Sequence, residues 1–462
     1  MNLPFIISLP ALVGLSLTLA LRCPAAEQKV FNVLDYGAKG DGTTLDTAAI
    51  QQTIDAAAAA GNGARVLIPR SHTFLISTLT LRANIDFHLQ AGAELVISTN
   101  RADYAGDGVL TAHNAENLTL SGRGKFLGRA LSFMTRYDAP GEWWLFKDWR
   151  PKMFVLTGCT NLVVRDLTFG DAPEWGLHLL GCHRVLVDGI TIRNHLDVPN
   201  CDGIDPDHCT DVLIKNCDIR SGDDAVVIKA TRQAQDYGPS ANIHVQDCVI
   251  ETQDSGLKIG TETTSDIRNI VFERCKIRTS SRGLTIQLRD EGSVSNIVFR
   301  DIQFTARYYS DPWWGRGEAI SFTAIPRTSD TRLGKIQAVR VENVRGVAEN
   351  SIRVYGTEPG HIEDIRFNNV SVKLNRWTKY PGGLFDNRPT KVDEPVPAHG
   401  NPGFALHNAA HVTLLNCRVR WGSNVPDYFT HALEAGNVTD LQLSRFTGEA
   451  AHPQRDAAIS VK

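Results

Sequence analysis

The chain has 462 residues, of which 42% are hydrophobic, and its formal net charge at pH 7 is -3. This length and apolar content are sufficient for one large domain with a long hydrophobic core, such as a solenoid. The small negative charge argues against a nucleic acid as the partner. It leaves an acidic substrate open, because the local charge in a cleft decides which ligand binds there.

Residues 1–26 are predicted to be an export signal. Leu3 to Leu21 form an apolar run, and Ala25 and Ala26 follow at the expected cleavage position. No Lys or Arg precedes the run, so a retained membrane anchor is the alternative. No later segment is long enough to span a membrane. We therefore expect a secreted or periplasmic protein in which residues 27–462 form a single domain.

A helix is predicted at residues 47–60, TAAIQQTIDAAAAA, with Ile50 and Ile54 on one face. It follows the segment NVLDYGAKGDGTTLD. Exposed strand edges invite pairing with other chains, so the end of a stack of strands must be covered. We expect residues from about 30 to 62 to form this N-terminal cap, and an ordinary surface helix is the alternative.

Beyond this helix the chain repeats a short pattern of alternating apolar and polar residues. The copies include NLTLSGRGKF, NLVVRDLTFG, DVLIKNCDIR and NIVFERCKIR, and the central copies start about 23 to 31 residues apart. This alternation indicates strands, and one copy cannot bury its own apolar face. The pattern predicts an all-β solenoid, a parallel β-helix. A β-propeller does not fit, because its blades need about 40 residues each.

The cysteines follow the repeat rather than a disulfide or zinc pattern. They occupy two repeat positions, the first held by Cys159, Cys182 and Cys209 and the second by Cys217, Cys248 and Cys275. A free cysteine behaves as a small buried hydrophobe. We expect these side chains to stack inside the solenoid and to form few disulfides.

Between Asn200 and Lys229 the chain reads NCDGIDPDHCTDVLIKNCDIRSGDDAVVIK, which places Asp202, Asp223 and Asp224 on two neighbouring copies. Adjacent turns of a β-helix lie about 4.8 Å apart, so Asp202 and Asp224 should lie about 5 Å apart. Like charges that close raise at least one pKa, which provides both a proton donor and a base. Glycoside hydrolysis needs this pair of carboxyl groups. The alternative is that these residues cap backbone groups at the corners of the solenoid.

Alignment of successive copies defines two columns of equivalent residues that we expect to line one groove with an acidic centre. The first column contains Asp202, Asp224, Ser255 and Arg282, and the second contains His178, Asp205, Val227, Lys258 and Thr285.

Aromatic residues fall in the longer intervals between copies, so we expect them on insertions rather than on strands. They form three groups: Trp143, Trp144 and Trp149; Tyr308, Tyr309, Trp313 and Trp314; Trp377 and Tyr380. Flat rings stack on the C–H faces of sugars. These residues either contact a carbohydrate or pack as lids over the solenoid.

On these motifs the sequence resembles glycoside hydrolase family 28, the polygalacturonases and related pectin hydrolases. The resemblance rests on NVLDYGAKGDGTTLDTAAIQQTI, DAPEWGLHLLGC, NCDGIDPD, SGDDAVVIK, DSGLKIGTE and RGLTIQLRD. It implies a right-handed parallel β-helix that cleaves α-linked uronic acid polymers with inversion and without a metal or other cofactor. It also implies that Asp223 is the general acid, that Asp202 and Asp224 hold the attacking water, and that Asn200 fills the asparagine position of the motif.

Two positions depart from the family pattern. Ser255 stands where the family has the histidine of a Gly-His-Gly motif, and Thr285-Ile286-Gln287 replaces the Arg-Ile-Lys motif that binds the substrate carboxylate. Thr and Gln cannot give charge-assisted hydrogen bonds, so galacturonate should bind there more weakly by a few kcal/mol. Either a nearby cation compensates, or the subsite takes another sugar, such as one of a rhamnogalacturonan or a neutral residue.

We therefore predict a monomeric glycoside hydrolase that acts on pectic polysaccharide, without a nucleic-acid partner and without a membrane span after the signal is removed. The candidates for substrate binding are Asn200, Asp205, His178, Lys229, Ser255, Lys258, Arg282, Gln287 and Arg289. A polysaccharide lyase is one alternative, and it would use an Arg or Lys base with calcium held by acidic residues. A non-catalytic carbohydrate-binding solenoid is the other.

Overall fold

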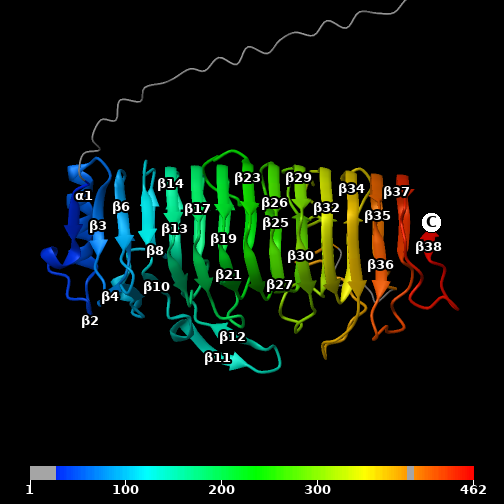
Figure 1. Ribbon diagram of the computed structural model, residues 1–462, viewed down its shortest axis with the longest axis horizontal. Coiled ribbons are helices and arrows are strands. Elements are labelled where there is room, and N and C mark those ends of the chain that lie inside the picture. The colour runs from blue at the N-terminus through cyan, green and yellow to red at the C-terminus, as the bar shows by residue number, and fades with distance from the viewer. Residues whose placement is uncertain (1–27, 393–399) are drawn as a thin grey trace, which may run out of the picture.

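The computed structural model describes residues 28–392 and 400–462 and shows the predicted right-handed parallel β-helix (Figure 1). Strands of successive turns stack along one axis, and the pairings within this stack are parallel. The fold class expected from the repeat is confirmed. The predicted export signal lies outside the described residues.

Three sheets form the sides of the solenoid. The first consists of β5 (Leu79–Thr80), β8 (Gly108–His113), β13 (Lys152–Thr157), β16 (Leu177–Leu180), β19 (Ile204–Asp207), β22 (Val226–Ala230), β25 (Ser255–Thr263), β28 (Arg282–Leu288), β31 (Glu318–Ala324) and β33 (Asn350–Gly356). The second consists of β1 (Val30–Asn32), β3 (Ala64–Ile68), β6 (Ile85–Leu89), β9 (Thr119–Gly122), β14 (Thr160–Arg165), β17 (His183–Asp188), β20 (Thr210–Lys215), β23 (Ser240–Gln246), β26 (Ile267–Glu273) and β29 (Val294–Arg300).

The third sheet consists of β2 (Asp41–Leu45), β4 (Thr73–Ile76), β7 (Glu94–Ile97), β10 (Lys125–Leu127), β15 (Thr168–Gly170), β18 (Thr191–Arg193), β21 (Asp218–Ser221), β24 (Val249–Thr252), β27 (Lys276–Ser280), β30 (Gln303–Ala306) and β36 (Arg418–Trp421). Near the C-terminus four longer strands each take part in two sheets, namely β32 (Ile336–Ala348), β34 (Ile362–Leu374), β35 (Phe404–Leu415) and β37 (Leu433–Ser444). The short strand β38 (Ile459–Val461) pairs with β37 at the far end.

The interior of the solenoid is filled by the apolar residues of each copy. Phe272 and Phe299 illustrate this packing, because they are paired in the strand register and their nearly parallel rings have centroids 5.0 Å apart. Phe322 of the first sheet packs on Phe299 across the interior, with centroids 5.6 Å apart. Equivalent side chains meet at each turn because the strands pair in register. The alternation in the sequence therefore becomes one continuous core.

Asparagines hold the corners in register. Asn242, Asn269 and Asn296 adopt positive φ angles of 57°, 58° and 55°, a conformation that asparagine tolerates better than most residues. Each side chain hydrogen-bonds to its equivalent in the preceding turn, with Asn269 Nδ2 donating to Asn242 Oδ1 at 2.9 Å. This ladder sets the spacing of neighbouring turns at the corner.

The predicted helix, α1 (Thr47–Ala60), covers the N-terminal end of the solenoid (Figure 1). Ile50 and Ile54 are fully buried and join the core, as the pattern predicted. The other helical segments in the described part of the chain are three short 3-10 turns, η1 (Val33–Tyr36), η2 (Arg101–Asp103) and η3 (Ala130–Phe133). The capping role expected for this region is observed.

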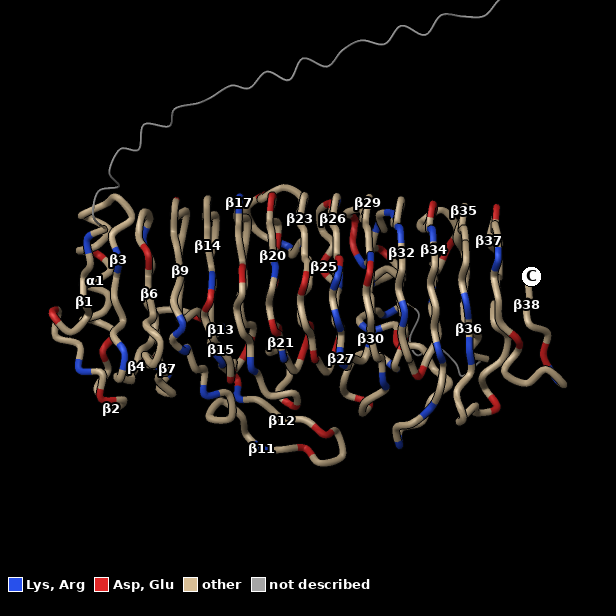
Figure 2. Tube along the Cα trace, viewed as in Figure 1, with Lys and Arg blue, Asp and Glu red and all other residues tan. Residues whose placement is uncertain are grey.

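The eight cysteines in the described ranges are buried and form no disulfide, which agrees with their repeat positions. Within the same ranges, no helix is long and apolar enough to cross a membrane. Acidic and basic residues are distributed along the whole solenoid (Figure 2).

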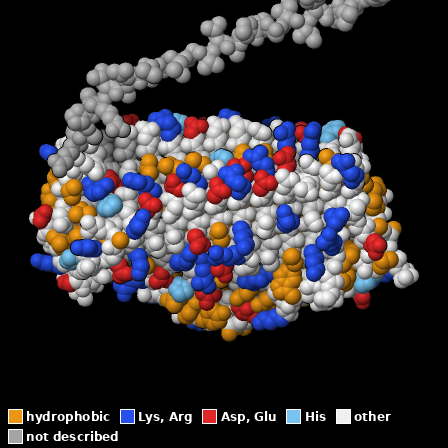
Figure 3. Space-filling view, in the orientation of Figure 1, with side chains coloured by type: hydrophobic (Ala, Val, Ile, Leu, Met, Phe, Trp, Pro, Cys, Tyr) orange, Lys and Arg blue, Asp and Glu red, His pale blue; other side chains and the backbone are white. Residues whose placement is uncertain are grey.

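An antiparallel hairpin of β11 (Met134–Asp138) and β12 (Trp143–Phe146) projects from one edge of the solenoid (Figure 1). Trp143 and Trp144 therefore lie on a strand, contrary to the expectation, although that strand belongs to an insertion. Hydrophobic side chains gather along this edge in the space-filling view (Figure 3). The repeat pattern does not reveal the hairpin, because its strands belong to no sheet of the solenoid.

Two later insertions meet this hairpin. The ring centroids of Trp143 and Trp313 lie 5.7 Å apart, and the Tyr380 hydroxyl donates to Glu142 Oε2 at 2.5 Å. The Ser310 hydroxyl donates to the Gly141 carbonyl at 2.5 Å. Three segments that are far apart in the sequence thus form one wall beside the first sheet.

Candidate active site

A pocket of about 320 Å³ lies between the first sheet and the wall of insertions. Its lining includes four aspartates and two lysines, Asp202, Asp223, Asp224, Asp254, Lys229 and Lys258, and five aromatic residues, Trp143, Phe146, Trp175, Trp313 and Trp314. The sequence motif with the clustered aspartates therefore lies in a hollow that also contains part of the aromatic set. Its volume lies at the lower end of the range of about 300–1,000 Å³ that is typical of small-molecule pockets.

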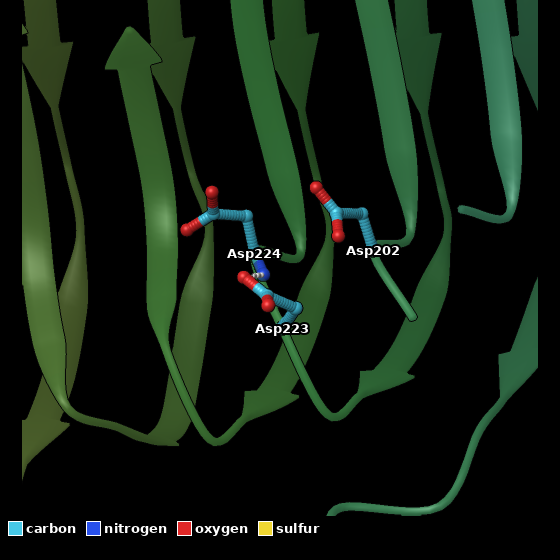
Figure 4. Close-up of side chains that lie close together, drawn as sticks. All are labelled: Asp202, Asp223 and Asp224. Atoms are coloured by element: carbon cyan, nitrogen blue, oxygen red, sulfur yellow. Dashed lines mark hydrogen bonds between the residues drawn. The ribbon is translucent and has the colours of Figure 1, made fainter. Parts of the chain in front are cut away.

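The three predicted aspartates converge in this pocket (Figure 4). Asp202, Asp223 and Asp224 each have a carboxylate oxygen within 4.8 Å of the others, in agreement with the expected turn spacing. Asp202 and Asp224 are 2% exposed, whereas Asp223 is only half-buried. The cluster forms because two consecutive turns place their aspartates at equivalent points.

The predicted columns are observed in the strand register. The pairing of Ile204 with Val226 and of Val226 with Leu257 puts Asp202, Asp224 and Ser255 at equivalent positions. The two columns are three residues apart, so simple alternation along a strand would place them on opposite faces. Asp202 and Asp224 of the first column and Lys258 of the second nevertheless line the same pocket, because Asp202 and Asp224 lie in the bends that precede β19 and β22. The other members of the two columns lie outside the pocket lining.

Asp223 experiences opposing influences on its protonation. Its carboxylate accepts hydrogen bonds from the backbone N–H of Asn200 at 3.0 Å and from that of Asp224 at 2.9 Å, which favour the ionised form. Burial and the negative charges of Asp202 and Asp224 outweigh these bonds and raise the pKa of Asp223 to about 7. A carboxyl group with this pKa keeps its proton under mildly acidic conditions and can donate it.

Asn200 reaches the pocket in the position that the motif implies. It adopts a positive φ of 59°, which directs its N–H toward Asp223. Its side-chain oxygen accepts a hydrogen bond from Arg150 Nη2 at 3.0 Å, and Arg150 also donates to the carbonyls of Pro173 and Pro199. Arg150 therefore fixes the loop that holds Asn200. It belongs to no repeat motif, so the sequence did not point to it.

Lys229 lies among three carboxylates. Its ammonium is 3.5 Å from Asp202, 3.6 Å from Asp205 and 3.5 Å from Glu262. Burial would lower the pKa of Lys229, but these negative charges raise it well above its usual value. Burial raises the pKa of Asp205 to about 7 and that of Asp202 well above its usual range.

Lys258 forms a short ion pair with Asp224, with 2.6 Å between Nζ and Oδ2. Both side chains are only 2% exposed. Burial would lower the pKa of Lys258, but the charges of Asp224 and Asp254 raise it. The ammonium therefore stays charged beside the carboxylate that the motif assigns to the water.

Asp254 is a further pocket carboxylate that the sequence reasoning missed. Asp224 and Ser255 occupy equivalent positions in neighbouring turns. The residues that precede them, Asp223 and Asp254, are therefore equivalent too. Ser255 Oγ donates to Asp254 Oδ1 at 3.0 Å, so Ser255 supports this carboxylate instead of contacting the pocket itself. Burial, followed by the charge of Asp224, raises the pKa of Asp254 well above its usual range. The alignment of successive copies could have identified Asp254, because it places this residue one turn after Asp223.

Besides Ser255 and the fully buried Asp205, three more predicted binding residues lie outside the pocket lining. Arg282, Gln287 and Arg289 are at most 1% exposed. Their side chains donate to the backbone carbonyls of residues 386, 388 and 387, at 3.3, 3.1 and 3.0 Å. This segment, about 100 residues later in the chain, covers them, so they offer no surface to a sugar in this structure.

His178 also lies behind the pocket rather than in its lining. Its Nε2 is 3.1 Å from Asp207 Oδ2, and its ring packs edge-on against Trp175 with centroids 4.9 Å apart. Burial lowers the pKa of His178. The histidine therefore supports Trp175, which does line the pocket and which the sequence reasoning did not select.

The three clustered aspartates are the carboxylates of the pocket that could hold a metal ion. Asp202, Asp223 and Asp224 could offer one oxygen each, whereas calcium takes about six to eight oxygen ligands. The Lys258 ammonium already contacts Asp224, and the Lys229 ammonium lies near Asp202. The cluster fits a calcium ion poorly.

Comparisons with known proteins agree with the motifs. Residues 60–380 match the model of "Glycosyl hydrolases family 28". The chain is 29% identical to a "Probable polygalacturonase" of Vitis vinifera over 43% of this chain and 44% of that protein, and 27% identical to a polygalacturonase of Medicago sativa over 53% and 65%. The chain thus spans about half the length of the curated relatives it matches.

Among solved structures, the chain is similar to an exopolygalacturonase from Thermotoga maritima, with a TM-score of 0.68 and 21% identity. The match covers 85% of this chain and 92% of that one, and at this identity it supports the fold alone. The family model, in contrast, covers well over half of the chain and includes all three clustered aspartates. The chain therefore belongs to glycosyl hydrolases family 28.

Proposed function

We propose that the protein is an exported, monomeric glycoside hydrolase that cleaves α-glycosidic bonds in pectic polysaccharide. The observation that carries this proposal is the cluster of Asp202, Asp223 and Asp224, whose oxygens lie within 4.8 Å of one another in an aromatic-lined pocket. The family and its polygalacturonase relatives support the reaction class and the type of substrate.

Asp223 has the environment of the general acid. Its pKa of about 7 keeps a proton available, and its half-buried position gives the substrate access to it. In the reaction, the bond between the anomeric carbon and the leaving oxygen breaks, and that oxygen takes the proton of Asp223. Proton donation of this kind contributes about 100- to 10,000-fold to the rate.

Asp224 and Asp202 have the environment needed to hold the attacking water. Asp224 forms an ion pair with the Lys258 ammonium at 2.6 Å, and its carboxylate accepts a proton from the water as the water oxygen attacks the anomeric carbon. The proton passes to solvent after the products leave, and Asp223 is then reprotonated. The reaction adds one water molecule to the cleaved bond and needs no other reactant.

A single displacement of this kind inverts the anomeric configuration. The family resemblance is the basis for proposing inversion. The oxygen separation of at most 4.8 Å is shorter than the roughly 6.5–9.5 Å between the carboxyl groups of most inverting enzymes. Proton NMR of the first product formed therefore decides this point, and a retained configuration would replace the single displacement by a covalent intermediate.

The product mass tests the reaction class. Purified protein is incubated with polygalacturonate and with rhamnogalacturonan, without added calcium, beside Asp223→Asn and the exposed control Asp330→Asn. We expect saturated products that have gained one water, a loss of at least about 100-fold in Asp223→Asn, and no loss in the control. Unsaturated products would establish a lyase. The absence of product from both polymers, and also from methyl-esterified and carboxyl-reduced polygalacturonate, would overturn the proposed function.

A further inference from the structure

We propose that the sugar residue held in the catalytic pocket carries no charge. The protein would then cleave next to a neutral sugar or an esterified uronate instead of next to free galacturonate. This inference rests on the proposed function and names the class of substrate residue that the site accepts. Its basis is the charge balance of the pocket.

Acidic groups outnumber basic groups among the described residues that line the pocket. Five carboxyl groups, those of Asp202, Asp223, Asp224, Asp254 and Glu262, face two ammonium groups, those of Lys229 and Lys258. Like charges placed close together in an enclosed site cost several kcal/mol. Burial and the crowding of carboxyl groups raise the pKa of Asp202, Asp223 and Asp254, so a negative charge is already unfavourable in this pocket. The carboxylate of galacturonate would add another one.

Both ammonium groups already have carboxylate partners. Lys258 lies 2.6 Å from Asp224, with both side chains 2% exposed, and Lys229 lies between Asp202, Asp205 and Glu262. A substrate carboxylate could recruit Lys258 only by weakening its ion pair with Asp224. A buried charge that loses its partner is strongly destabilised. The lysines therefore balance the catalytic carboxylates and are poor receptors for a uronate.

The guanidinium groups near the pocket do not replace the missing Arg-Ile-Lys motif. Arg282 and Arg289 are fully buried under residues 386–388, and Arg282 lies 3.3 Å from Asp386. Arg327 is 2.6 Å from Asp290 and 3.6 Å from Glu262, so it too has acidic partners. The pocket lining within the described ranges contains no arginine.

The groups that the pocket does offer suit an uncharged sugar. The carboxyl oxygens of Asp254 and Glu262 can accept hydrogen bonds from sugar hydroxyls. The rings of Trp143, Trp175 and Trp313 provide flat apolar surfaces for the C–H faces of the sugar. A neutral sugar or a methyl ester satisfies these groups without introducing a charge.

The decisive experiment compares polymers that differ in charge. Polygalacturonate is tested beside the same polymer after reduction of its carboxyl groups, which keeps each linkage and removes the charge. Methyl-esterified homogalacturonan and rhamnogalacturonan are the third and fourth substrates, and they distinguish an ester from a neutral sugar. We expect at least one uncharged or partly neutral polymer to be cleaved at least about tenfold faster than polygalacturonate.

Hydrolysis in ¹⁸O-labelled water identifies the sugar that occupied the pocket, because the label enters the new reducing end. Mass spectrometry should find the label on a neutral or esterified residue. A label on free galacturonate, or polygalacturonate as the fastest substrate, would overturn this inference while leaving the proposed function intact.

Failure to cleave any of the four polymers would instead reject the proposed function. Calorimetry with Asp223→Asn then still tests the inference, using oligogalacturonates and their carboxyl-reduced forms as ligands. Binding of the reduced forms alone supports an uncharged sugar. Equal or tighter binding of the acidic forms, or no binding of either, overturns it.

Discussion

The pKa of Asp223 provides the sharpest test of the proposed mechanism. Burial and the charges of Asp202 and Asp224 raise this pKa to about 7. The general acid works only with its proton, so kcat/KM should fall as pH rises through about 7. In the variant Asp202→Asn, one of the two like charges is removed while the shape of the side chain is kept, and the pKa of Asp223 should fall.

The size of this change follows from the geometry. The Asp202 and Asp223 oxygens lie within 4.8 Å. Two unit charges about 5 Å apart at an effective dielectric constant of about 20 repel by about 3 kcal/mol, or about 2 pKa units. Burial raises the pKa of Asp202 itself, which reduces the negative charge that it exerts on Asp223. We therefore expect the pKa of Asp223 to decrease by about 1 unit.

NMR titration of ¹³C-labelled aspartate carboxyl groups measures this pKa directly and does not depend on the residual activity of the variant. The signal of Asp223 is assigned by its disappearance in Asp223→Asn. The exposed control Asp330→Asn should leave the pKa of Asp223 unchanged. The reasoning is refuted if Asp223 titrates near 4 in the wild-type protein, or if Asp202→Asn leaves its pKa unaltered.

Three other predictions concern stability, substrate binding and calcium. Burial raises the pKa of Asp205 to about 7, so its favourable contribution is present at low pH and is lost as pH rises through 7. Between pH 5 and 8 the unfolding free energy of the wild-type protein, measured by guanidinium titration, should therefore fall more than that of Asp205→Asn. An equal fall in the wild-type protein and the variant would contradict this. Arg282→Met should lower the unfolding free energy by about 3 kcal/mol at pH 7, because Arg282 is fully buried beside Asp386. Its KM should stay within about twofold of the wild-type value, and a large rise in KM at unchanged stability would restore Arg282 as a binding residue. Chelation of calcium should leave the rate of hydrolysis unchanged, because ammonium groups already lie beside Asp224 and Asp202; a loss of activity that calcium reverses would refute this.

The strand register shows which part of the site the sequence could predict. Asp202 and Asp224 belong to consecutive copies of one repeat, and parallel pairing brings equivalent positions together. The spacing of turns then follows from backbone geometry alone. Asp254 was equally predictable, since it occupies the position equivalent to Asp223 in the next turn. It was missed because the family motifs include Asp202, Asp223 and Asp224 but not Asp254.

The cations illustrate what the repeat pattern could not show. Lys258 and Arg282 are both on the sheet that faces the pocket, and both were expected to contact substrate. The structure leaves Lys258 in the pocket, paired with Asp224, and covers Arg282 with residues 386–388. The difference depends on an insertion about 100 residues away, and insertions follow no repeat.

The sequence by itself therefore determined the solenoid, its N-terminal cap and the meeting of the three aspartates, because each depends on local alternation and on a regular spacing of copies. Only the tertiary structure decided the walls and the charge balance of the pocket. The hairpin at residues 134–146 and the later insertions fold back onto the first sheet through long-range contacts, such as those of Trp143 with Trp313 and of Tyr380 with Glu142. These contacts determine which side chains remain accessible to a sugar and which become part of the core.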